Sequence, residues 1–371
     1  MKLIYLTTLQ YPSPYANRVN VMKMAASFND LVDDFTLVIG PLLASKEEVL
    51  RSYGIERPFV IEVLGPPPIF WPKSFFSALR LRKLIKRESS ITRHEPPETV
   101  FYIRDFLLAY FLSHISSPFQ KNYFIECQSL GKFFHVIYRR VFQKARGIIS
   151  SNHAKIQEIH ERYGVPLERM MVGPNGFDEA LFNHLPSPHE ARAHLGFPQD
   201  KRIVLYAGST LGWKGTDIIR DIAKALPDIL FVIVGAHAEK QEGNMVHIRK
   251  QDLRRVPMYL RAADVLIAPY RSDTERAQRY FSPIKIFEYM ASGIPFVTTD
   301  LPAVREFLNE DNAFLVKEYS AKAFEETIRY AFDHREERER RAKNAKEQSR
   351  YFSWQNRAVR IVGFLEQRLR T

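Results

Sequence analysis

Short apolar runs recur along the chain, separated by segments in which apolar residues follow helical spacing. In the first half these runs are rich in β-branched and aromatic residues, and they predict buried strands at 2–8, 35–40, 99–105, 122–127 and 147–150. A second series predicts strands at 202–208, 230–235, 265–270 and 295–299. Segments with helical periodicity lie between them at 20–28, 216–226 and 283–292. Because short buried strands that alternate with helices form parallel α/β sheets, the pattern predicts two doubly wound α/β domains.

The segment 170–202 separates the two series. It is rich in Pro, Gly, Asn and Asp and has no sustained period, so we place the domain junction near Pro174 to Phe177. We expect an N-terminal Rossmann-like domain at 1–173 and a C-terminal one at 174–351.

Two further segments are read as helices. The charged run 334–350 is typical of a solvated helix stabilised by ion pairs four residues apart. The segment 352–371 carries Trp354, Val359, Val362 and Leu365 on one side, which predicts a C-terminal helix that packs back on the N-terminal domain.

Composition narrows the classes of protein. A length of 371 residues fits two domains, and the single Cys127 excludes an internal disulfide and a cysteine zinc cluster, which favours a reducing compartment. The first residues lack the apolar core of a signal peptide, and no run approaches the roughly 20 apolar residues that span a bilayer. We therefore expect a cytoplasmic protein. The 54 Lys and Arg exceed the 42 Asp and Glu by 12, which points to a phosphate-bearing ligand, nucleic acid or an anionic membrane.

Ligands of doubly wound domains bind beyond the carboxyl ends of the strands, so the residues there are the candidates for a site. The loop AGSTLGWKG (207–215) offers Gly208 and Gly215 for tight turns and Lys214 for a phosphate. It matches neither a dinucleotide-binding fingerprint nor a phosphate-binding P-loop. A surface turn with a solvated lysine would fit the same residues.

The segment 279–297 is more informative. Ser282 and Pro283 suit the start of a helix, and Gly293 and Pro295 end it before the next strand. The free amides and positive dipole at such a helix start can bind a diphosphate, with Lys285 in the first turn. Glu288, further along, could accept hydrogen bonds from a ribose. The alternative is an ordinary capped helix with an exposed glutamate.

These segments carry a family resemblance. The stretches 206–226, 263–270, 282–297 and 174–178 resemble the donor-binding half of family-4 retaining glycosyltransferases with the GT-B fold. The resemblance implies two Rossmann-like domains facing across a cleft and transfer of a sugar from a nucleotide-diphosphate sugar to a glycan or lipid-linked acceptor. It also implies retention at the anomeric carbon, no metal cofactor, and a role in polysaccharide or glycolipid synthesis, in the cytoplasm or on the inner face of the cell membrane.

The resemblance also implies site residues. Lys214 would bind the donor diphosphate and act in catalysis, and Glu288 would bind the ribose. Gln128 stands where the family usually has a histidine near the donor sugar. The full donor set is Gly208, Ser209, Lys214, Phe281, Ser282, Ile284, Lys285 and Glu288, and the acceptor set is Tyr15, Asn17 and Arg18.

The sequence departs from the family at three positions. Tyr280 replaces a glutamate that is common eight residues before Glu288, and Ser209 replaces an arginine that is common five residues before Lys214. Gln128 cannot carry a proton, although its amide can bind a sugar. These departures keep open a non-catalytic GT-B binding protein, and a sugar-nucleotide epimerase or phosphorylase on the same fold is a further alternative.

The segment 66–87 mixes aromatic residues with Arg80, Lys83, Lys86 and Arg87 on one side of a helix. It could lie in an anionic membrane interface, or it could be a packed helix of the first domain whose basic side faces water. Nucleic acid is not an expected partner, because the basic residues are spread over both domains instead of clustering with aromatic residues. No metal is expected, since no Asp-x-Asp triplet occurs.

Overall fold

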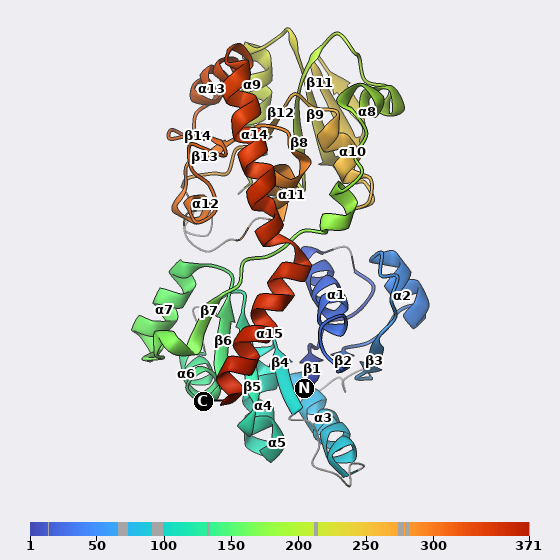
Figure 1. Cartoon of the computed structure of the whole chain (residues 1–371), viewed down its shortest axis with the longest axis vertical. Coiled ribbons are helices and arrows are strands. Elements are labelled where there is room, and N and C mark those ends of the chain that lie inside the picture. Colours follow the sequence, from blue (N-terminus) through green and yellow to red (C-terminus); the bar gives the residue numbers. More distant parts are fainter. Residues whose placement is uncertain are drawn as a thin grey trace. The chain divides into compact units, whose positions relative to one another are not determined.

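The structure is a computed structural model of the chain. It describes all residues except 14, 66–72, 91–98, 132–133, 211–213, 274–277, 279–281, 283 and 371, and it leaves out the side chains of 16, 73, 84–90 and 117–118. The chain divides into two compact units, Met1–Pro174 with Trp354–Thr371, and Asn175–Ser353. We call them the first and the second domain (Figure 1).

The first domain has a parallel sheet with the strand order β3-β2-β1-β4-β5-β6-β7. Its strands are β1 (Lys2–Leu6), β2 (Asp34–Ile39), β3 (Val60–Val63), β4 (Thr99–Ile103), β5 (Tyr123–Cys127), β6 (Gly147–Ser150) and β7 (Met170–Val172). Its helices are α1 (Ala16–Asn29), α2 (Lys46–Ser52), α3 (Lys73–Ser90), α4 (Phe106–Ile115), α5 (Ser117–Lys121), α6 (His135–Lys144), α7 (His153–Tyr163), the 3-10 turn η1 (Leu167–Arg169) and α15 (Trp354–Arg370).

Alternate residues of β1 enter different cores because successive side chains of a strand point to opposite faces. Ile4 and Leu6 join the apolar cluster that includes residues of α4 and α6. Tyr5 points the other way and meets Phe28 of α1, with ring centroids 6.0 Å apart. The sheet is therefore covered by helices on both faces (Figure 1).

A buried ion pair ties the last helix to this sheet. Arg357 of α15 and Glu126 of β5 are both fully buried, and a guanidinium nitrogen lies 2.8 Å from the carboxylate. Arg357 also donates to the carbonyls of Gly173 and Pro174, at 3.2 and 2.7 Å, where the chain leaves the first domain. Although burial alone would raise the pKa of Glu126, the charges of Arg104 and Arg357 lower it to about 2.

The second domain has the strand order β10-β11-β9-β8-β12-β13-β14, and only β10 runs antiparallel to its neighbour. Its strands are β8 (Arg202–Ala207), β9 (Ile229–Ala236), β10 (Lys240–Glu242), β11 (Met245–Arg249), β12 (Val265–Ala268), β13 (Phe296–Thr299) and β14 (Phe314–Val316). Its helices are α8 (Pro188–Leu195), α9 (Ile219–Ala225), α10 (Val256–Arg261), α11 (Ile284–Ser292), α12 (Pro302–Arg305), α13 (Ala321–Asp333), α14 (Arg335–Ser349), and the 3-10 turns η2 (Glu179–Phe182), η4 (Thr216–Ile218) and η6 (Arg350–Phe352).

The same alternation builds this domain. Ile203 and Leu205 of β8 join a cluster with residues of α10 and α11, whereas Val204 and Tyr206 join one with residues of α9 and α13. Helices again cover both faces of the sheet, as in a doubly wound fold (Figure 1).

All nine predicted strands are present, but the pattern missed five more: β3, β7, β10, β11 and β14. The two units divide between Pro174 and Asn175, inside the predicted junction, although the segment 170–202 also contains β7, η2 and α8, which its lack of a period did not reveal. These elements are too short for a visible period. Helix α8 had readable end signals, since Ser187 and Glu190 form a capping box and Gly196 ends it with φ +70°.

The two predicted C-terminal helices are confirmed, with one error. In α14, Arg335 pairs with Glu339 at 2.7 Å, while Ala342 and Ala345 are buried. In α15, Trp354 and Leu365 are buried, but Val359 is 49% exposed and does not belong to the packed side. At helical spacing Val359 lies outside the face that Trp354, Ala358, Ile361 and Leu365 bury, and Arg357 belongs to that buried face.

Helix α3 begins inside the predicted basic segment 66–87, of which 66–72 lie outside the described residues. Ala78 and Leu81 are buried, and the ring of Phe75 lies 5.2 Å from that of Phe111 in α4. Arg80 and Lys83 are exposed. The described half of α3 therefore uses its apolar side within the domain, which favours the packed-helix alternative over an interfacial one. No helix of the described chain is long and apolar enough to span a membrane.

We predict that Arg357→Met destabilises the first domain by about 3 kcal/mol, because it removes one of the two buried guanidinium groups that compensate Glu126 and leaves two backbone carbonyls without their donor. Gln355→Met, at an exposed position of the same helix, is the matched control. Urea unfolding of the full chain followed by circular dichroism measures the difference. Equal unfolding free energies for Arg357→Met and the control would show that the pair does not hold α15.

Candidate functional site

The loop after β8 and the start of α11 meet at the carboxyl end of the second sheet. Gly208 has φ +143°, and a Cβ there would lie 2.9 Å from Cε and Nζ of Lys285. A glycine is therefore required both by its backbone conformation and by the close approach of this lysine. Gly208 and Lys285, which were predicted separately as donor residues, are neighbours in the folded domain.

Lys285 lies in the first turn of α11 and is only 7% exposed. Its ammonium nitrogen lies 3.5 Å from the ring centroid of Tyr206 and 5.7 Å from that of Tyr270. In the described chain this nitrogen has no hydrogen-bond partner. Burial, and next the charge of Lys214, hold the pKa of Lys285 well below its usual range, against the opposing effect of Glu288. Lys285 is thus a buried amine that has no hydrogen-bond partner in the described chain and whose charged form is disfavoured in the free protein.

Lys214 extends this positive region. Its ammonium donates to the hydroxyl of Ser209 at 2.7 Å, and the carbonyl of Ser209 accepts from the hydroxyl of Tyr206 at 2.7 Å. Gly215 has φ +69°, and a Cβ there would lie 1.5 Å from the carbonyl oxygen of Pro269. The ends of the 208–215 loop are thus fixed against the carboxyl ends of β8 and β12. Residues 211–213 between them lie outside the described part.

Tyr289 fixes α11 against the same strand ends. Its hydroxyl accepts from the amide of Ala207 at 2.9 Å and donates to the carbonyl of Ile267 at 3.2 Å. These two bonds join one helix to the ends of β8 and β12. They set the depth at which Lys285 and Glu288, one turn apart, enter the site.

Glu288 supplies an acidic group beside the two lysines. Burial raises its pKa to about 7, although the charges of Lys285 and Lys214 act in the opposite direction. Its side chain is partly accessible, unlike that of Lys285. A carboxyl group in this state can accept hydrogen bonds from hydroxyl groups of a ligand, as the ribose role requires.

Ser282 is held by a residue far away in the sequence. Its hydroxyl accepts from the backbone amide of Asn175 at 2.9 Å, and its carbonyl accepts from the Asn175 side chain at 2.8 Å. Ser282 was predicted to cap the helix, but in the structure its hydroxyl binds Asn175. Ile284 is the first residue of α11. Phe281, a predicted donor residue, and Tyr280 and Pro283 lie outside the described residues.

The arrangement suits an anion with a hydroxyl-bearing neighbour. Two ammonium groups and the amino end of α11, a helix of nine residues, meet at one place. A phosphate there would compensate the buried charge of Lys285 and interact favourably with the helix dipole. Glu288 lies one turn further along, where a polar group attached to the phosphate would reach it.

The predicted acceptor residues lie at the start of α1 in the first domain. Tyr15 is 67% exposed, and the guanidinium of Arg18 lies 5.5 Å from its ring centroid. Arg18 also donates to the side chain of Asn17 at 3.0 Å. The three side chains thus form one group, in which Tyr15 and Asn17 are exposed and Arg18 is half-buried.

Gln128 connects to this group through buried charges. It follows β5, and its amide donates to Glu126. Arg104 lies 3.7 Å from the second carboxylate oxygen of Glu126 and donates to the carbonyl of Asn17 at 3.4 Å. Gln128 and the predicted acceptor residues, which sequence analysis treated as two unrelated sets, are thus joined by one network through Glu126 and Arg104.

The second domain matches a known protein family. Residues 188–348 match the family model described as Glycosyl transferases group 1. The second domain is a group 1 glycosyl transferase domain. This confirms the predicted family at that level, and the family-4 subdivision stays a prediction.

Similar proteins match about half of this chain. A D-inositol 3-phosphate glycosyltransferase of Xylanimonas cellulosilytica is 25% identical over 246 residues, which cover 60% of this chain and 57% of that protein. A putative teichuronic acid biosynthesis glycosyltransferase of Bacillus subtilis, TuaH, is 26% identical over 180 residues, or 44% of this chain and 43% of its own. The chain thus spans about half the length of these curated relatives.

Solved structures match the whole chain in fold. HepE of Anabaena, in complex with UDP, is 17% identical with a TM-score of 0.74, and the match covers 99% of this chain and 100% of that one. The predicted GT-B class is confirmed as two doubly wound α/β domains.

Three residues of the group 1 domain site were missed from the sequence. Asn175 lies in the stretch 174–178, but nothing local indicates that it binds Ser282, 107 residues away. Tyr206 and Tyr270 follow the pattern of buried strand residues, and only the structure shows their rings beside Lys285. Among the residues that the structure describes, no three His, Cys, Asp or Glu side chains are grouped so as to hold a metal ion.

We predict that Glu288→Gln stabilises the group 1 domain at high pH. The folded-state pKa of about 7 exceeds the ordinary 4.5, so the wild-type domain loses stability as the pH rises from 4.5 to 7. The full loss, up to about 3 kcal/mol, is present above pH 7. Unfolding free energies at several pH values should show the variant more stable at pH 8 and equal to wild type near pH 4.5. A pH-independent difference would contradict the raised pKa.

Proposed function

We propose that the protein is a glycosyltransferase that moves a sugar from a nucleoside-diphosphate sugar to a glycan or lipid-linked acceptor. The observation that carries this proposal is the buried ammonium of Lys285, which has no hydrogen-bond partner in the described chain and lies at the start of α11. A diphosphate would supply the missing negative charge. The family of the second domain supports a sugar transfer, and the UDP complex of HepE makes UDP the first nucleotide to test.

The second domain would bind the donor. Lys285 and Lys214 would hold the diphosphate together with the amides at the start of α11, and Gly208 would let the phosphate approach the backbone. Glu288 would accept hydrogen bonds from the ribose hydroxyls. Ser282, fixed by Asn175, would shape the same turn.

These residues would also promote the reaction. When the bond to the sugar breaks, negative charge grows on the departing diphosphate, and fixed cations in a site of low dielectric stabilise that charge. Two lysines and a helix start can do this without a metal ion, which is the route we propose. Retention of configuration, with the leaving phosphate accepting the proton of the acceptor, follows from the family resemblance.

The first domain would bind the acceptor. Tyr15, Asn17 and Arg18 offer an exposed aromatic ring, an amide and a cation, which suit a sugar or a phosphate-linked carrier. Gln128 would contact a sugar through its amide oxygen, because its nitrogen is directed to Glu126. Because the described apolar side of α3 is packed within the domain, association of 66–87 with an anionic membrane would depend on its basic side alone, through the exposed Arg80 and Lys83.

We predict that Lys214→Ala lowers turnover at least ten-fold, a loss of about 1.4 kcal/mol of transition-state stabilisation. Glu288→Ala should mainly weaken nucleotide binding, because it removes hydrogen bonds to the ribose. The exposed Lys343→Ala is the matched control. Nucleotides and nucleotide sugars that raise the melting temperature identify the donor, and its consumption with an acceptor measures turnover.

Two outcomes would decide against parts of this proposal. Full activity of both site variants would exclude the assigned donor site. Nucleotide binding without turnover for any acceptor would favour the non-catalytic alternative. A requirement for Mn²⁺ or Mg²⁺ that survives careful chelation controls would contradict the metal-free route.

The buried lysine also predicts a pH dependence. Diphosphate binding favours the charged form of Lys285, whereas burial and Lys214 lower its pKa in the free protein. Affinity for the nucleoside diphosphate should therefore fall as the pH rises through this lowered pKa, and binding should take up protons. Calorimetry in buffers of different ionisation enthalpy measures this uptake. Lys285→Met should bind more weakly and lose the pH dependence; an unchanged dependence would assign it to another group.

A further inference from the structure

A basic pocket lies at the amino end of the first sheet, away from the residues discussed so far. Lys121, Arg146 and Arg169 come one or two positions before β5, β6 and β7, three neighbouring parallel strands. Because parallel strands begin at the same edge of a sheet, their charges converge. Lys144 at the end of α6 and Arg368 near the end of α15 complete the group.

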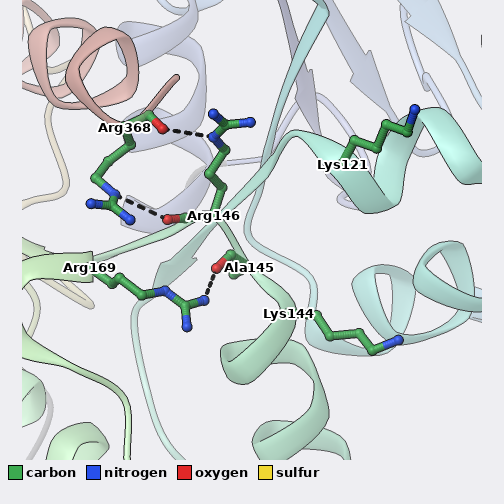
Figure 2. A pocket seen from close by; sticks show the side chains of 6 residues that line it. All are labelled: Lys121, Lys144, Ala145, Arg146, Arg169 and Arg368. Carbon is green, nitrogen blue, oxygen red and sulfur yellow. Dashed lines mark hydrogen bonds between the residues drawn. The ribbon is translucent and has the colours of Figure 1, made fainter. Parts of the chain in front are cut away.

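The five side chains line an open, shallow cavity of about 370 Å³, whose sixth lining residue is Ala145. Figure 2 shows the two lysines on one side and the three arginines on the other. No lining residue is acidic. The cavity has the size of a small-molecule site, but it lacks the aromatic and aliphatic walls of one, so charge has to supply the binding energy.

Capping of helix C-termini accounts for the arginines of this group but not for its lysines. Arg146 donates to the carbonyls of Arg368 and Leu369 at 2.7 Å each, and Arg169 donates to that of Gln143 at 3.0 Å, so both arginines satisfy helix C-termini. Lys121 and Lys144 make no hydrogen bond or ion pair in the described part of the chain. Capping therefore fixes the arginines in place and leaves the lysines unexplained.

The positive charges that line the pocket also repel one another. Burial, and next the charge of Arg368, lower the pKa of Arg169. One guanidinium nitrogen of Arg169 makes all of its hydrogen bonds, so its other two nitrogens are left without a partner among the described residues. A planar guanidinium with free donors beside two ammonium groups matches the oxygens of a phosphate.

We propose that this pocket binds a phosphate group, either of a soluble phosphate ester or of an anionic lipid headgroup. It is a second anion site, distinct from the proposed donor and acceptor sites. Within the first domain, Lys121 and Gln128 lie at opposite ends of β5, whose five residues span roughly 16 Å, so a ligand of the pocket does not reach Gln128. The absence of aromatic side chains from its lining disfavours single-stranded nucleic acid, which stacks its bases.

Lysine acetylation of the full chain tests the proposal at the pocket itself, so that binding at the donor site does not interfere. Inorganic phosphate is added in one arm, and vesicles of phosphatidylglycerol and phosphatidylcholine in equal parts in the other, at constant low ionic strength. At ten times the dissociation constant about one site in ten is free, so acetylation of Lys121 and Lys144 should slow about ten-fold. Lys201 and Lys343, exposed in the second domain, should not change.

The arms separate the two sources. Protection by inorganic phosphate alone assigns a soluble phosphate ligand, and protection by the vesicles but not by inorganic phosphate assigns a lipid headgroup. If neither probe slows the acetylation of Lys121 and Lys144 relative to that of Lys201 and Lys343, the proposal is overturned.

A charge-matched pair of variants provides a second measurement. Lys121→Glu with Lys144→Glu should weaken binding of whichever probe protects the pocket at least about 30-fold, since each lysine near an anionic surface contributes roughly a five-fold factor. Lys201→Glu with Lys343→Glu changes the net charge equally and should leave that binding unchanged. Equal affinities of the two double variants would overturn the proposal even where protection is seen.

Discussion

The common direction of the strands is the constraint on which both anion sites depend. In the two sheets every pairing is parallel except that of β10 with β11. In such a sheet the helices that follow strands begin at the carboxyl edge, and the helices that precede strands end at the amino edge. One edge therefore gathers positive helix dipole ends and the other gathers carbonyls. The proposed donor site of the second domain uses the first kind of edge, and the basic pocket of the first domain uses the second.

Glu126 and Lys285 are both buried ionisable residues, but among the residues that the structure describes only Glu126 has partners of opposite charge that bind it. Glu126 is fully buried, but Arg357, Arg104 and Tyr102 compensate it, and its pKa falls to about 2. Lys285 is almost as buried, yet in the described chain its nitrogen has no hydrogen-bond partner and lies over the rings of Tyr206 and Tyr270, and burial holds its pKa below the usual range. A compensated charge holds the fold together. An uncompensated one costs stability, and a ligand that neutralises it recovers that cost on binding.

The sequence predicted the elements whose signals are local. Buried strands of four or more residues are visible as apolar runs. Lys214 and Lys285 became candidates because they follow a strand end or lie in the first turn of a helix, and Glu288 became one because it lies further along the same helix. Strands β7 and β14, with three residues each, are too short to show a period. The contact of Asn175 with Ser282 and the convergence of Lys121 with Arg368 could not be predicted, because they depend on pairings between residues more than a hundred positions apart.

The net charge of +12 now has two local explanations that differ in kind. Lys285 is enclosed by protein, so mobile ions screen its field weakly, and the neutralising group must enter the site itself. Lys121 and Lys144 are exposed, and their attraction for an anion decays over a Debye length of about 8 Å at physiological ionic strength. Added salt should therefore weaken binding at the pocket far more than binding at the donor site. The buried cation suits selection of one substrate, whereas the exposed cluster suits capture of any phosphate presented at close range.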